Sequence, residues 1–96
     1  MALFNISYDL IKDKDYTRLT SGIKKTVSNW ARPLESTWLV EWDGTSLELT
    51  NAVVQFMDTD DKIFVSGVAK GTMSWRGLAK GVVDWINNVV SRLRAA

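Results

Sequence analysis

The chain of 96 residues contains no cysteine and no histidine. These absences exclude a thiol nucleophile, a serine–histidine–aspartate triad, a structural zinc site and an imidazole acid or base. The chemistry that remains uses carboxylates, hydroxyls, Lys, Arg and the backbone, together with a hard metal ion that prefers oxygen ligands. Any catalytic centre must therefore be built from these groups.

Excess charge and long apolar runs are also missing. The formal net charge is only +1, so no global basic field indicates a nucleic-acid ligand, and such a site must be a local patch. No apolar run of about 18 residues occurs. The first residues lack the basic and long apolar regions of a secretory signal. We therefore expect a soluble, cytoplasmic protein that does not enter a membrane.

Hydrophobic residues are present in an amount that suits one folded core. They make up 46% of the chain and include five tryptophans, which is not the composition of a disordered segment. A second core would need a longer chain. We expect a single domain over residues 1–96, with a core at 1–70 and a loop and C-terminal helix at 71–96.

Residues 2–9 alternate as a strand with two unlike faces does. The apolar face carries Phe4, Ile6 and Tyr8, and the mixed face carries Leu3, Asn5, Ser7 and Asp9. Two candidate helix caps follow, Asp13 and Asp15. Apolar side chains then recur at spacings of three and four: Tyr16, Leu19, Ile23, Val27 and Trp30. This spacing predicts an amphipathic helix that reaches Trp30.

The rest of the chain alternates between strand and helix patterns. Residues 33–42, which begin with Pro33, predict a second strand, either continuous or bent near Ser36 into two. Thr45 and Glu48 have capping-box spacing and predict a second helix. Residues 62–68 are rich in β-branched and aromatic side chains, which indicates another strand. An apolar stripe from Leu78 onward predicts a third helix; it comprises Val82, Trp85, Val89 and Leu93, with Arg92 and Arg94 in the last turn.

This order predicts an α+β fold, a ferredoxin-like two-layer sandwich with a β-α-β-α-β core, an antiparallel sheet and an added C-terminal helix. Two helices would cover one face of the sheet. The other face needs cover too, because Trp38 and Trp42 are too apolar to be left bare. We expect the last helix, a dimer partner or both to supply it.

Several segments of the chain together resemble one protein family. They are ISYDL at 6–10, DY at 15–16 with Leu19, LESTWLV at 34–40, DDKIFV at 60–65 and WRG at 75–77. In this order and spacing they resemble the SinR-like proteins, small bacterial relatives of the CRISPR-associated Cas-two family and of the VapD-type toxins. The resemblance covers roughly residues 3–77.

The resemblance implies a ferredoxin-like protomer that forms a symmetric homodimer. In the family, the aspartate that closes the first strand faces its symmetry mate, and the pair can hold Mg²⁺ for phosphodiester hydrolysis in members that cleave RNA or DNA. That position is Asp9 here. Ser36 and Trp38 match the family's Ser-x-Phe element, Arg32 matches a basic position of the nucleases, and Arg18 matches the charged start of the first helix. The chain departs from many CRISPR-associated members by ending in a helix, where they end in a strand that adds to the partner's sheet.

Two interpretations of Asp9 stay open. A single carboxylate binds Mg²⁺ poorly because the ion takes six oxygen ligands, but two aspartates brought together by a two-fold axis, with phosphate oxygens, suffice. Alternatively, Asp9 caps the turn after its strand through local hydrogen bonds to the backbone.

Two further clusters are weighed in the same way. Asp58, Asp60 and Asp61 lack the glycine and glutamate of a calcium-binding loop, so they predict a solvated turn. Most tryptophans lie on predicted apolar faces and should pack in the core. Trp75 and Arg76 instead stand in a glycine-bounded loop, where a ring and a cation suit single-stranded nucleic acid.

The leading hypothesis is a homodimeric nucleic-acid-binding protein, with Mg²⁺-dependent endonuclease chemistry at paired Asp9 side chains and RNA or DNA as the ligand. Arg18 or Arg32 would hold phosphate. The competing hypothesis is a non-catalytic dimeric scaffold or adaptor.

Overall fold

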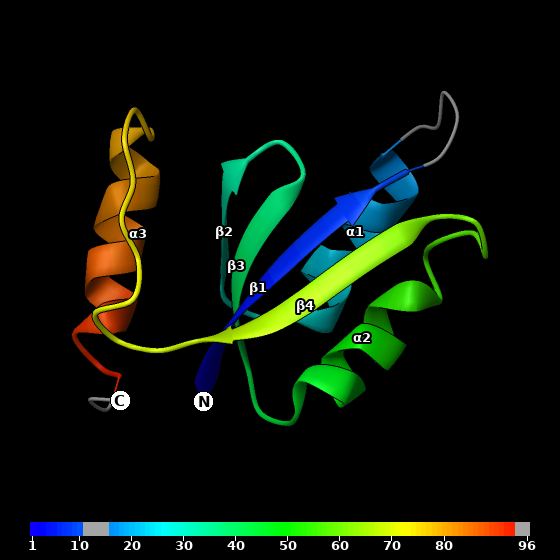
Figure 1. The fold of residues 1–96 in the computed structure, drawn as a ribbon, viewed down its shortest axis with the longest axis horizontal. Helices are drawn as coiled ribbons and strands as arrows, with labels where there is room; N and C mark the ends of the chain where they lie inside the picture. Colours follow the sequence, from blue (N-terminus) through cyan, green and yellow to red (C-terminus); the bar gives the residue numbers. More distant parts are fainter. Residues whose placement is uncertain (11–15, 94–96) are drawn as a thin grey trace.

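The computed structural model describes residues 1–10 and 16–93. In order along the chain, its elements are β1 (Ala2–Asp9), α1 (Thr17–Thr26), β2 (Trp30–Leu34), β3 (Thr37–Trp42), α2 (Ser46–Val54), β4 (Lys62–Val68) and α3 (Lys80–Val90). The strands form one antiparallel sheet in the order β2-β3-β1-β4. Figure 1 shows α1 and α2 together in one layer, with α3 separate and beside β2. The expected α+β sandwich with an added C-terminal helix is confirmed.

The first helix is shorter than its apolar spacing predicts. It ends at Thr26, the backbone of Val27 is already extended, and Trp30 opens β2. The expectation that the helix reaches Trp30 is wrong because β2 pairs with β3, with Trp30 opposite Val40. Pairing satisfies the backbone of this segment while the Trp30 ring still packs 4.9 Å from the ring of Trp38. The proposed caps Asp13 and Asp15 lie outside the described residues.

Residues 30–42 form a hairpin. β2 and β3 are joined by a turn at Glu35 and Ser36, so of the two expected alternatives the chain takes the pair of short strands. Pro33 is accommodated because β2 is an edge strand, where a missing backbone donor can face away from the ladder.

The main core lies between the sheet and the layer of α1 and α2. Its buried side chains include the apolar faces predicted for the first strand and the first helix, which are Phe4, Ile6, Tyr8, Leu19, Ile23 and Val27. Trp38 and Val40 of β3 and Leu49 and Val53 of α2 complete it. The predicted capping box starts α2, because Glu48 N donates to Thr45 Oγ1 at 3.1 Å and Thr45 N donates to Glu48 Oε1 at 2.9 Å.

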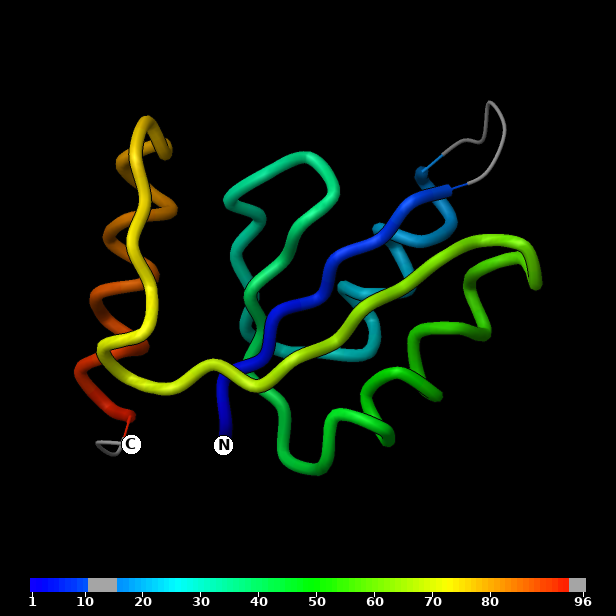
Figure 2. The backbone as a smooth tube through the Cα atoms, in the orientation of Figure 1, coloured from blue at the N-terminus to red at the C-terminus, as the bar shows by residue number. Residues whose placement is uncertain are grey.

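The opposite face of the sheet is covered in part by α3. Leu3 and Leu39 are buried against Ile86 and Val89 of this helix. Trp38 and Trp42 do not need this cover, since both lie on the face toward α1 and α2. Figure 2 shows the loop after β4 running back along α3, so that loop and helix form one unit next to β2.

Polar contacts fix α3 in this position. The Glu41 carboxylate, on a residue only 8% exposed, accepts hydrogen bonds from Asn29 Nδ2 at 2.5 Å and Arg92 Nη2 at 3.2 Å. Trp85 Nε1 of α3 donates to Asn29 Oδ1 at 2.8 Å. We call Asn29, Glu41, Trp85 and Arg92 the α3 clamp. Arg92 was expected in the last helical turn but follows the end of α3, and Arg94 lies outside the described residues.

No helix in residues 1–10 or 16–93 has the length and apolar character needed to span a bilayer.

Gly22→Ala should destabilise the protein, although alanine favours helices by about 1 kcal/mol over glycine. A Cβ at Gly22 would clash with the ring of Phe56, and overpacking of this kind costs about 1–3 kcal/mol. Urea denaturation of the variant measures the change. Gly81→Ala in α3 is the matched control, because its Cβ would meet nothing within 4 Å and should raise stability. A gain in both variants would contradict this packing.

Arg92→Met should lower the free energy of unfolding by about 1–3 kcal/mol, since it leaves the Glu41 carboxylate with an unmet hydrogen bond in a buried site. The matched control is Lys80→Met, which removes an exposed pair with Asp84 and should change stability by less than about 1 kcal/mol. If chemical denaturation gave equal losses of the free energy of unfolding for the two variants, the Arg92–Glu41 bond would contribute no more than an exposed ion pair, which contradicts the expectation.

Candidate nucleic-acid interface

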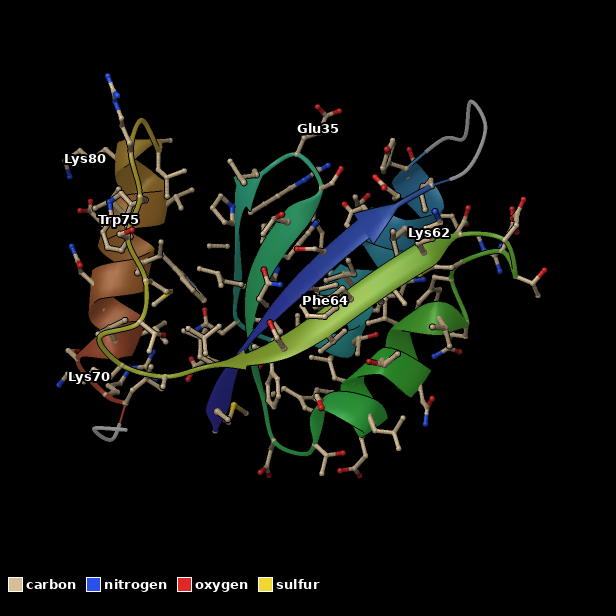
Figure 3. The ribbon with its side chains drawn as sticks, in the orientation of Figure 1. Glu35, Lys62, Phe64, Lys70, Trp75 and Lys80 are labelled. Carbon is tan, nitrogen blue, oxygen red and sulfur yellow. The ribbon has the colours of Figure 1, made fainter. Side chains whose placement is uncertain are left out.

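Half of the sheet face that carries α3 is left uncovered. The pairing of the strands places on this side a set of partly or fully exposed residues, which we call the open face: Asn5, Ser7, Asp9, Leu34, Thr37, Lys62, Phe64 and Ser66. Figure 3 shows Phe64 midway along β4, with Lys62 near the start of the same strand. The open face combines polar side chains with two large apolar ones.

One row of this face crosses the whole sheet. Phe64 lies opposite Ser7, Ser7 opposite Thr37, and Thr37 opposite Leu34. Because strands are about 4.8 Å apart, the row is about 14 Å long. Its centre is polar, with the hydroxyls of Ser7 and Thr37 3.3 Å apart. Its ends are apolar and bare, with Phe64 66% and Leu34 59% exposed.

Asp9 stands at the end of β1, next to this row. It is exposed, lies opposite Lys62 on β4, and borders a shallow hollow of about 310 Å³ that Ser7, Ser36 and Phe64 also line. Hydroxyl and carboxylate oxygens therefore gather here. Within the described residues, however, no acidic cluster that could hold a metal includes Asp9. One protomer offers a single carboxylate at this position.

The hairpin turn beside Asp9 is held by hydrogen bonds. Trp38 Nε1 donates to the Tyr8 hydroxyl at 3.0 Å, and this hydroxyl donates to the Glu35 carbonyl at 3.3 Å. The backbone N–H of Tyr8 donates to the Ser36 carbonyl at 3.1 Å. These bonds tie the turn to β1, which is why Ser36 and Asp9, far apart in sequence, border the same hollow.

The two arginines expected to hold phosphate both donate to carbonyl groups of the protein itself. Arg32 donates to the Glu35 carbonyl at 2.9 Å from Nε and 2.6 Å from Nη2, and its guanidinium lies 5.4 Å from the Trp38 ring centroid. Arg18 donates to the Gln55 carbonyl at 3.0 Å and lies 3.7 Å from the Asp58 carboxylate. Neither has a described contact with the open face. Both guanidinium groups stabilise turns of the protein itself.

Trp75 and Arg76 lie together at the other end of the row. They line a hollow of about 320 Å³ between the loop after β4 and the hairpin, and Leu34, Leu39 and Ile86 line it too. Trp75 is 39% exposed. Figure 3 places Trp75 beside α3, across the sheet from Phe64. Since Leu34 belongs to both the row and this hollow, the two surfaces adjoin.

The other four tryptophans pack in the two hydrophobic cores or against their buried residues. Trp38 is fully buried, Trp30 and Trp42 pack against the same core, and Trp85 joins the α3 clamp. The expectation that most tryptophans serve packing is confirmed.

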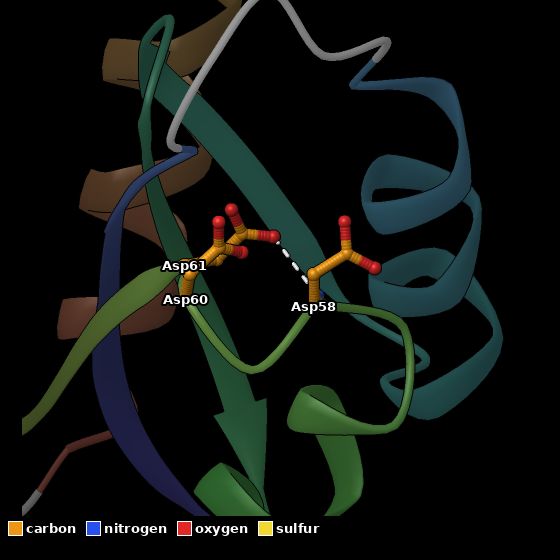
Figure 4. Close-up of side chains that lie close together, drawn as sticks. All are labelled: Asp58, Asp60 and Asp61. Carbon is orange, nitrogen blue, oxygen red and sulfur yellow. Dashed lines mark hydrogen bonds between the residues drawn. The ribbon is translucent and has the colours of Figure 1, made fainter.

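The acidic cluster lies in the turn between α2 and β4, as expected. One carboxylate oxygen from each of Asp58, Asp60 and Asp61 lies within 4.8 Å of the others. Figure 4 shows the bond that organises the turn, in which Asp58 N donates to Asp61 Oδ2 at 2.9 Å. Together with the Arg18 contact, this is the structure of a capped, charged turn.

Sequence reasoning missed Lys62, Leu34 and Phe64 as site residues. Residues 62–68 were identified as a strand, and alternation within them puts Lys62, Phe64 and Ser66 on one face. That signal was available. What the alternation could not reveal is that no helix covers this end of the face.

Comparison with known proteins adds no identification. No protein-family model matches the chain, and no solved structure gives a significant match to it. Function must therefore be argued from the residues of the open face and its neighbours.

Proposed function

We propose that this protein binds single-stranded nucleic acid along the open face and the adjoining hollow, from Phe64 to Trp75. The observation that carries the proposal is the Phe64 ring, which stands 66% exposed in the middle of a strand. A large aromatic side chain in such a place is ordinarily buried. A base stacked on the ring would remove it from water, and such stacking contributes about 1–3 kcal/mol per base.

Each exposed ring on this side of the protein has a cation close in sequence. Lys62 lies two residues before Phe64 on the same face, and Arg76 follows Trp75 in the loop. Rings that take bases and cations that meet the phosphates between them are the usual parts of a single-strand site. The hydroxyls of Ser7 and Thr37 add hydrogen-bonding groups between the two rings.

The same groups favour a single strand over a duplex. Stacking on a protein ring requires a base whose face is free, and the bases of a duplex are already stacked on one another. With two cations available, few phosphates are neutralised. A plot of the logarithm of the association constant against the logarithm of the salt concentration should then have a slope of only about −1.4, since each phosphate contact contributes about −0.7.

Phe64→Ala should weaken binding of a short single-stranded RNA or DNA by about 5- to 150-fold, which corresponds to the loss of one stacked base. Fluorescence anisotropy with a labelled oligonucleotide measures the change. Leu47→Ala is the matched control, because Leu47 on α2 is also 66% exposed but lies away from the open face. Equal affinity of the Phe64 variant and the unmodified protein would rule out the stacking site.

Asp9 favours a second candidate function, which is Mg²⁺-dependent phosphodiester hydrolysis by a homodimer. Its carboxylate is exposed on the open face and has no described hydrogen bond or ion pair, so it is available to a ligand. Two such carboxylates sharing one Mg²⁺, with ligand distances of about 2.1 Å, could activate a water for attack on phosphorus. Lys62, opposite Asp9, would then hold the phosphate.

Asp9→Asn should abolish Mg²⁺-dependent cleavage of RNA or DNA while leaving binding of the uncleaved strand within about twofold, because metal-bound water generates the nucleophile in this mechanism. Gel assays with Mg²⁺ and with EDTA provide the measurement. Asp84→Asn, on the exposed side of α3, is the matched control. Cleavage that survives in the Asp9 variant would remove this centre, and binding without cleavage by the unmodified protein would assign a non-catalytic scaffold or adaptor.

A further inference from the structure

The two edges of the sheet differ in how they resist pairing with another strand. β2 has five residues, contains Pro33, has an irregular register between Ala31 and Leu34, and lies beside α3. These are devices that keep an edge strand from joining another chain. β4 is seven residues long, has no proline and carries one charge, Lys62, at its start. Within the described residues no strand pairs with its outer side.

We propose that β4 pairs with β4 of a second copy of this chain, antiparallel about a two-fold axis at Val65, so that the two sheets become one. An exposed edge strand presents every second backbone N–H and C=O group to solvent, and an antiparallel partner satisfies them. A two-fold axis makes the contact self-complementary, since both copies offer the same strand.

The sequence of β4 suits this register. Val65 faces the partner's Val65, Phe64 faces the partner's Ser66, and Ile63 faces the partner's Gly67, so that large side chains meet small ones. Directly opposed cross-strand pairs decide how well two strands fit, and none of these pairs brings two bulky rings or two like charges together. The two Lys62 side chains lie at opposite ends, six residues or about 20 Å apart along the strands, so they do not repel.

The dimer would bring the two open faces together on one side. The two Phe64 residues become diagonal neighbours across the axis, about 7–8 Å apart, which is within reach of aromatic side chains. This consequence rests on the proposed nucleic-acid function: two rings would present stacking surfaces for two bases of one strand. The two Asp9 carboxylates would stay about 25 Å apart, from three strand spacings across and about 20 Å along. The β4 dimer and a shared Asp9 metal site are therefore alternatives.

Light scattering of the purified chain tests the contact. We expect a dimer for the unmodified protein and a monomer for Ser66→Lys. Residue 66 faces the partner's Phe64, so the substitution places two ammonium groups near the axis, where they repel each other. Ser66 is partly exposed, so the variant should keep its fold, which circular dichroism checks. Leu34→Lys is the matched control on the opposite edge, 59% exposed, and should remain a dimer. A monomeric unmodified protein, or a dimeric Ser66 variant, overturns the proposal.

Cross-linking tests the register independently of the charge. The chain has no natural cysteine, so Val65→Cys provides one thiol per protomer. Directly opposed residues in an antiparallel pair have Cα atoms about 4.5–5.5 Å apart, within the range of a disulfide. Oxidation should link the Val65 variant and leave Ile63→Cys, which faces the partner's Gly67, largely unlinked. The reverse pattern overturns the register. Neither experiment contains nucleic acid, so its outcome does not depend on the proposed binding.

Discussion

The burial of one charged group, the Glu41 carboxylate, determines how the second face of the sheet is used. A buried charge must be paired and hydrogen-bonded to be tolerated. The partners of Glu41 are Asn29, just before β2, and Arg92, just after α3, while Trp85 of α3 binds the same asparagine. Because these groups must meet at one place, α3 docks near the end of β3 that carries Glu41. Leu3 and Leu39 are buried against the same helix.

This placement divides one sheet face into a covered and an uncovered half. The covered half is apolar at Leu3 and Leu39, and it also holds the Glu41 carboxylate with its hydrogen-bonding partners. The uncovered half has hydroxyls at its centre and exposed apolar side chains, Phe64 and Leu34, at its margins. Phe64 is thus exposed because the helix that could have covered it is fixed elsewhere. The proposed binding of bases uses a surface that the protein's own structure leaves bare.

The two proposed dimers would use this surface in different ways, and they exclude one another. A face-to-face dimer could bring two Asp9 carboxylates around one metal ion but would bury the Phe64 rings. An edge-to-edge dimer through β4 would keep the rings accessible and the carboxylates apart. Asp9 and Phe64 lie on neighbouring strands of the same face, so each proposed dimer would leave a different one of them in a position to bind a ligand.

The fold class could be predicted from the residues alone, because alternation and helical spacing reflect local burial. The strands at 2–9 and 62–68, the capping box at Thr45 and the apolar face of α1 were all predicted in this way. The prediction was wrong at Trp30. A helix and a strand would both place this ring against the same core, and only the pairing with β3 shows that the segment is a strand.

Asp9 and Ser36 were predicted as site residues from the sequence, and the hairpin brings them to one hollow. Arg18 and Arg32 were predicted too, but each guanidinium donates to a backbone carbonyl of the protein itself, that of Gln55 for Arg18 and that of Glu35 for Arg32. The exposure of Phe64 and the burial of Leu39 could not be predicted in this way. Exposure on a sheet depends on where a helix from another part of the chain docks, and no local pattern encodes that position.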